Sequence, residues 1–78
     1  MEEKSLIEWA IKGIHAEIDR LEKDINTGRR LLLQYERGEK PKTSKTPDEI
    51  RDIIAKLKAE TEELNRQRVY LVWRKMEY

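Results

Sequence analysis

The chain contains no cysteine and no phenylalanine, only three glycines and two prolines, and no long run of apolar residues. The missing cysteines exclude a disulfide scaffold and a cysteine-based zinc site, and they favour a cytoplasmic protein. A bilayer-spanning helix needs about 18 consecutive apolar residues, which this sequence nowhere approaches. The first residues also lack the basic-then-apolar layout of a signal peptide. We therefore expect a cytoplasmic protein with no membrane segment.

The chain also lacks an excess of either charge, although 42% of its 78 residues are charged. Seventeen basic residues face sixteen acidic ones, which excludes a simple basic tail or an acidic mimic. Only 18 residues are Ile, Leu or Val, so a single domain over residues 1–78 has a small core. Because disulfides are absent and metal ligands are poor, association is the remaining way to add stability.

What the chain does contain is a regular spacing of its few apolar residues. In the first half they recur at steps of four and three, at Ile7, Ile11, Ile14, Ile18, Leu21, Ile25, Gly28, Leu32 and Tyr35. In the second half a seven-residue repeat runs through Ile50, Leu57, Leu64, Leu71 and Tyr78. Such heptad spacing is typical of long helices that pack along a seam.

The ends of both helices are marked by local signals. Ser5 with Glu8, and Thr46 with Glu49, each fit the capping box that begins a helix. Gly38 is a typical residue just beyond a helix end. The expected elements are a helix at 5–37, a linker at 38–46 and a helix at 47–77.

The stretch Asn-Thr-Gly at 26–28 leaves one alternative open. It allows the first helix to end early, with a short third helix at 29–37, because glycine inside a helix costs about 1 kcal/mol. The seam nevertheless stays in phase across this stretch, with Leu32 and Tyr35 at the expected positions. The spacing therefore favours a continuous helix.

Folding the chain at the linker matches the two repeats when paired residue numbers sum to 85. The pairs are Tyr35 with Ile50, Gly28 with Leu57, Leu21 with Leu64, Ile14 with Leu71, and Ile7 with Tyr78. This predicts an all-α fold, an antiparallel two-helix coiled-coil hairpin in which each helix is about 50 Å long.

The hairpin leaves half of the first seam beside mostly polar residues of the second helix. Burying an isoleucine is worth roughly 1.5–3 kcal/mol, so these side chains are expected to find another cover. We expect a second copy to supply it, giving a homodimer built as a four-helix bundle. The residues expected to mediate self-association are Ile11, Ile18, Ile25 and Leu32.

A second group of apolar residues lies off both seams, near the two chain ends that the hairpin brings together. Trp and Met are enriched at protein interfaces. The group either completes the core of the dimer or binds a different protein. Its members are Leu6, Trp9, Val69, Val72, Trp73 and Met76.

No arrangement of residues indicates catalysis, and we expect no enzyme, metal or cofactor. His15 and Asp19 have a metal-compatible spacing on a helix, but His15 is the only histidine and the Glu-x-x-His motif of di-iron bundles is missing. Basic residues next to Tyr70 and Trp73 are the strongest sign of another ligand, since such patches bind phosphate backbones and bases. The candidate phosphate contacts are Arg66, Arg68, Arg74 and Lys75.

The sequence thus favours a non-enzymatic protein–protein interaction module, such as a small adaptor, regulator or inhibitor, that works as a self-associating helical hairpin. Its expected partners are a second copy and another protein. One alternative is a nucleic-acid-binding helical bundle that uses the basic patches. Another is a dimer with a small-molecule pocket at its Trp-rich end, near Trp9, Tyr70, Trp73 and Arg74.

Overall fold

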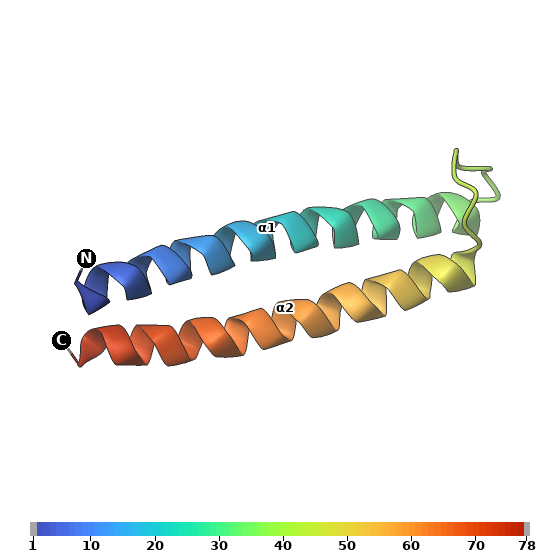
Figure 1. Cartoon of the computed structure of the whole chain (residues 1–78). Coiled ribbons are helices and arrows are strands. Elements are labelled where there is room, and N and C mark those ends of the chain that lie inside the picture. Colours follow the sequence, from blue (N-terminus) through green and yellow to red (C-terminus); the bar gives the residue numbers. More distant parts are fainter. Residues whose placement is uncertain (1, 78) are drawn as a thin grey trace.

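The protein is a helical hairpin, as seen in a computed structural model that describes residues 2–77 (Figure 1). Helix α1 covers Glu3–Glu36 and helix α2 covers Pro47–Met76, and the two run antiparallel with both chain ends at one end of the rod. The rod measures 55 × 17 × 16 Å. The predicted all-α hairpin and its length are confirmed. We call the end that carries the linker the tip and the opposite end the open end.

Helix α1 is continuous through Gly28, as the spacing of its apolar residues predicts, and the alternative break at 26–28 does not occur. The helix begins at Glu3 rather than Ser5, because the Leu6 amide already donates to the Glu2 carbonyl at 3.1 Å. The predicted capping role of Ser5 is therefore wrong. At the other end, the Gly38 and Glu39 amides donate to the Tyr35 and Gln34 carbonyls. Gly38 has a φ of 76°, the left-handed conformation that glycine adopts most readily at such a helix end.

Helix α2 begins as its capping box predicts. The Glu49 amide donates to the Thr46 hydroxyl at 3.2 Å, and that hydroxyl donates to the Glu49 carboxylate at 3.3 Å. Pro47 occupies the first turn, where its missing N–H leaves no helical bond unmade. Asp48 in the same turn adds a negative charge at the positive end of the helix dipole.

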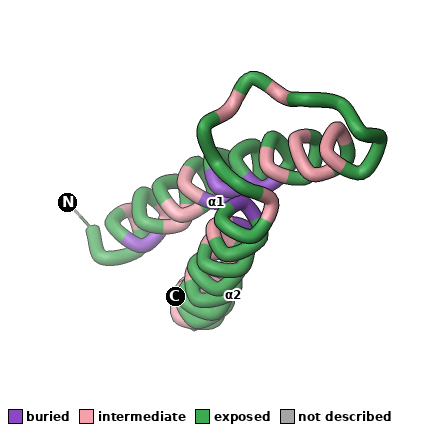
Figure 2. The backbone as a smooth tube through the Cα atoms, turned by 90° about the vertical axis from the view of Figure 1, so that its right-hand side faces the viewer, coloured by how far each residue is buried: buried purple, intermediate pink, exposed green. Residues whose placement is uncertain are grey.

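The core lies along the line where the two helices face each other (Figure 2). Its buried members are Ile7, Ile18, Leu21, Ile25, Ile50 and Ile54. Two of the isoleucines expected to lack partners, Ile18 and Ile25, are only 6% exposed in the single chain. The other two residues of that set, Ile11 and Leu32, are half-buried. One chain therefore already covers Ile18 and Ile25, whereas Ile11 and Leu32 stay partly accessible, and self-association through this stripe stays a prediction.

Ile18 and Ile25 are covered because the helices meet in a register shifted from the predicted one. Ile54, rather than Leu57, lies closest to Gly28. A Cβ added at Gly28 would lie 3.0 Å from both Cδ1 and Cγ1 of Ile54. Ile25 consequently clusters with Ile50 and Ile54 instead of facing Glu60. The predicted pair of Ile7 with Tyr78 lies outside the described residues.

Polar contacts fasten the rod at both ends. At the tip, the Tyr35 hydroxyl donates to the Lys45 carbonyl at 2.7 Å and so holds the linker against α1. At the open end, Arg74 of α2 donates to the Glu3 carboxylate at 2.7 Å. Lys75 lies 3.5 Å from the Glu8 carboxylate. Neither described helix is long and apolar enough to cross a membrane.

Candidate interaction surfaces

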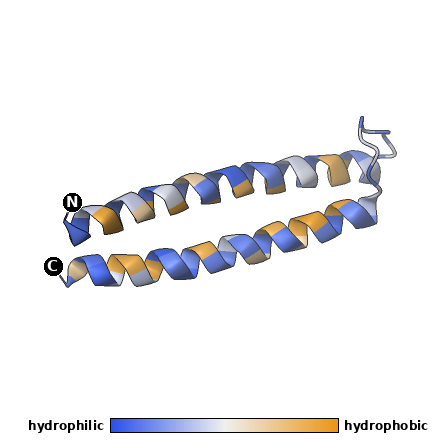
Figure 3. Cartoon of the chain, viewed as in Figure 1, coloured by the Kyte–Doolittle hydropathy of each residue, from blue (hydrophilic) through white to orange (hydrophobic). Residues whose placement is uncertain are grey.

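Large apolar side chains that remain exposed gather at the open end of the rod. Among residues 2–77, seven of the eight such side chains lie there, and Leu33 lies near the tip. Apolar residues close to the C-terminal end of α2 are visible in Figure 3. The seven are Leu6, Trp9, Val69, Tyr70, Val72, Trp73 and Met76. All six apolar residues that the sequence singled out near the chain ends are thus accessible in one chain.

Four of these residues form a single stripe on α2, which we call the open-end stripe: Val69, Val72, Trp73 and Met76. Val72, Trp73 and Met76 follow Val69 by three, four and seven residues, which places all four on one helix face. This face is separate from the one that packs on α1. Leu71, which belongs to the packed face, is half-buried, whereas Trp73 is 66% exposed. The spacing matches the anchor positions of a helix that lies in a groove of another helix pair.

A shallow groove of about 360 Å³ runs between the open-end stripe and α1. Its lining comprises His15 from α1 and Arg68, Val69, Val72 and Trp73 from α2. The groove therefore has an apolar wall, one permanent cation and no acidic side chain. A carboxylate on a bound segment would meet Arg68 there with favourable charge.

Leu6 and Trp9 share the open end but lie on a different side of the rod. Trp9 follows the buried Ile7 by two residues, which turns it about 200° around α1, away from α2. It is 70% exposed and does not line the groove beside His15. The expectation that the fold joins the two patches into one is therefore wrong, since helical periodicity separates them.

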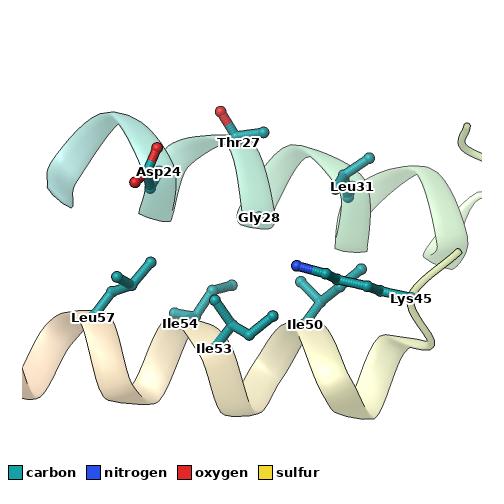
Figure 4. Close-up of a pocket in the computed structure, with 9 residues that line it drawn as sticks. All are labelled: Asp24, Thr27, Gly28, Leu31, Lys45, Ile50, Ile53, Ile54 and Leu57. Atoms are coloured by element: carbon teal, nitrogen blue, oxygen red, sulfur yellow. The ribbon is translucent and has the colours of Figure 1, made fainter. Parts of the chain in front are cut away.

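A second groove, of about 280 Å³, lies between the helices near the tip (Figure 4). Gly28 lines it from α1, and Figure 4 shows the Lys45 side chain reaching over Ile50 from the linker. We call it the tip groove. It is lined by Asp24, Thr27, Gly28, Leu31, Lys45, Ile50, Ile53, Ile54 and Leu57. One sequence feature points to this groove, the small Gly28 in an apolar seam.

The basic residues of α2 do not form an unpaired patch. Arg66 lies 2.9 Å from the Glu63 carboxylate, while Arg74 and Lys75 pair with carboxylates of α1. Arg68 is half-buried beside His15. Three of the four predicted phosphate contacts thus have a carboxylate within 4 Å, which lowers the local positive potential.

The residues of the suggested small-molecule pocket are also divided between surfaces. Tyr70 lines a groove with Leu71 and Gln67, whereas Trp73 lines the one beside His15. Among residues 2–77 no group of three or more His, Cys, Asp or Glu side chains could hold a metal ion. The Glu17 carboxylate raises the pKa of the exposed Arg20 guanidinium, first by accepting a hydrogen bond from it and second by its negative charge.

Comparisons with known proteins add no functional assignment. No protein-family model, curated protein or solved structure matches the chain. Function must therefore be inferred from the surfaces themselves.

Proposed function

We propose that the protein is a non-enzymatic protein–protein interaction module, a self-associating hairpin that binds an amphipathic helix of another protein on its open-end stripe. The observation that carries the proposal is the stripe itself. Four large apolar side chains at helical spacing remain exposed, where monomeric proteins rarely leave contiguous apolar area. An aromatic residue, Trp73, stands within the stripe as an anchor of the kind that dominates helix recognition.

The charge around the stripe supports a particular partner. Arg68 and His15 border it, and its groove has no acidic side chain. An amphipathic helix with carboxylates beside its apolar face would be favoured over one with lysines. The core of the hairpin is small, with six buried side chains among residues 2–77, and this also favours a protein that gains stability by association.

A synthetic helix tests this proposal. The probe is a peptide with leucines at i, i+3, i+4 and i+7 flanked by glutamates, and the readout is the fluorescence of Trp73 in a Trp9→Phe background. We expect saturable binding with a blue shift, and at least about tenfold weaker binding of a lysine-flanked peptide. Val72→Glu should abolish binding by putting a charge into the stripe, whereas Leu33→Glu, which changes an exposed leucine near the tip, should not. Equal binding by both variants would overturn the proposal.

A further inference from the structure

Helix α1 carries a second line of residues beside the face that packs on α2, and one of them, Leu31, also packs against the core. The line repeats at steps of four and three through Leu6, Ala10, Gly13, Glu17, Arg20, Asp24, Thr27 and Leu31. None of these residues is buried in the single chain, although each lies on a described helical turn. A repeat that averages 3.5 residues stays on one face over its whole length. Leucine or alanine occupies three of its positions, and small, polar or charged residues occupy the others. We call it the outer seam.

The two ends of the outer seam are complementary in shape. At the N-terminal end Leu6 projects into solvent, followed by the small Ala10 and Gly13. At the C-terminal end three seam residues, Asp24, Thr27 and Leu31, form the α1 wall of the tip groove. One chain therefore offers a projecting leucine at one end of a helix face and an apolar recess at the other.

The geometry points to a second copy of this chain as the occupant: two α1 helices pack antiparallel along their outer seams, with paired residue numbers summing to 37. This inference rests on the self-association in the proposed function and names its surface. In this register leucine faces leucine, the small Ala10 and Gly13 face polar side chains, and Glu17 faces Arg20. The pairs are Leu6 with Leu31, Ala10 with Thr27, Gly13 with Asp24, and Glu17 with Arg20. The twofold axis passes between residues 18 and 19, so each pair occurs twice.

Charge selects this orientation over a parallel one. Glu17 of each chain faces Arg20 of the other across the axis, where the same two residues already pair within one chain. Glu3 and Glu8 at the start of α1 already pair with Arg74 and Lys75 of the same chain, which offsets the negative charge at the open end. The segment 29–45 near the tip has six basic residues and two acidic ones. Parallel packing would place two such basic tips together, whereas antiparallel packing keeps them at opposite ends of the particle.

Trp9 gains a neighbour in the same arrangement. It stands directly before seam residue Ala10, as Arg30 stands directly before seam residue Leu31. Trp9 and Arg30 therefore lie along the same edge of the outer seam. In the antiparallel dimer this edge of one chain lies beside the same edge of the other chain. The exposed Trp9 ring of one chain then lies near the Arg30 guanidinium of the other, a favourable cation–aromatic contact.

Cysteine cross-linking tests the register, and the chain has no native cysteine to interfere. In Ala10→Cys/Thr27→Cys the two new thiols are about 25 Å apart along one helix, so they cannot bridge within a chain. We expect mild oxidation to give a covalent dimer. The matched control, Ala10→Cys/Asn26→Cys, places the second cysteine at the neighbouring exposed position 26 instead of 27. Position 26 points away from the seam, so this variant should not form the cross-link. Equal yields, or efficient self-linking of Ala10→Cys alone, would overturn the antiparallel register.

A charge swap tests the same interface without cysteine. Glu17→Arg and Arg20→Glu each place like charges across the axis and should weaken dimerisation at least about tenfold in sedimentation equilibrium. The double variant Glu17→Arg/Arg20→Glu reverses both and should restore the wild-type dimer. A wild type that stays monomeric at 100 µM, or a double variant no better than the singles, would refute the inference. Val72→Glu separates the two proposals, because it should leave this dimer intact while removing binding of the glutamate-flanked peptide.

Discussion

At the scale of single residues, two glycines of α1 have opposite surroundings. An added Cβ at Gly13 meets no atom within 4 Å, whereas at Gly28 it meets Ile54 at 3.0 Å. Ile54 is buried with Ile25 and Ile50 and has little room to move. The sequence singled out Gly28 as a place of close approach, yet it could not name the neighbour, because that depends on the register of the two helices.

We expect Gly13→Ala to raise the free energy of unfolding by about 1 kcal/mol, since alanine removes the entropic cost of a helical glycine. Gly28→Ala gains the same helix propensity but overpacks the core, which typically costs about 1–3 kcal/mol. It should therefore lower stability by about 1 kcal/mol. Urea unfolding followed by circular dichroism measures both. Equal stabilisation by the two substitutions would contradict the close contact with Ile54.

At the scale of elements, the helices were predictable and their contact was less so. The heptad repeat and the Thr46 capping box predict a long first helix and the start of α2, because these signals are local. The register was predicted from a numerical match of repeats, whereas the side-chain volumes around Gly28 decide it. The same shift buries Ile18 and Ile25 inside one chain.

The two predicted capping residues give a matched test of helix starts. Thr46 caps α2 with a hydrogen bond from the Glu49 amide, so Thr46→Ala should cost about 1 kcal/mol of stability. Ser5 lies inside α1 and makes no capping bond, so Ser5→Ala should change stability by less than about 0.5 kcal/mol. Thermal and urea unfolding of both variants at one chain concentration would show the difference. A larger loss for Ser5→Ala would mean that α1 begins at the residue the sequence indicated.

Burial of Ile18 makes a further prediction about how α1 is held. Ile18→Ala should lower the free energy of unfolding by about 2–5 kcal/mol, because it opens a cavity inside one hairpin. In the Glu17→Arg background, where the proposed dimer is weakened, the loss should persist undiminished. Leu33→Ala, at an exposed position, should cost less than about 0.5 kcal/mol. If the effect of Ile18→Ala vanished in the Glu17→Arg background, Ile18 would belong to the dimer interface instead.

At the scale of the whole molecule, the rod has more helix surface than one partner helix can cover. Each helix is covered by the other on one side only, which leaves α1 with its outer seam and α2 with its open-end stripe. The sequence could predict that uncovered apolar surface remains, because the chain is short and its aliphatic residues are few. It could not assign the faces, since that requires knowing how the two helices are rotated about their axes.

The shape of the assembled dimer distinguishes these two surfaces. Packing along the outer seam with a register of 37 overlays the rods almost completely, so the longest dimension should grow only from 55 Å to about 60 Å. Packing two open-end stripes antiparallel would overlap only the last turns and give a particle of about 100 Å. Small-angle X-ray scattering with the mass measured on the same sample separates these outcomes. A doubled mass with a dimension near 60 Å supports side-by-side packing, because an interface that runs along the length of the rods keeps the particle short. A doubled mass with a longest dimension near 100 Å would instead assign self-association to the open-end stripe. The second copy would then compete there with the proposed partner helix.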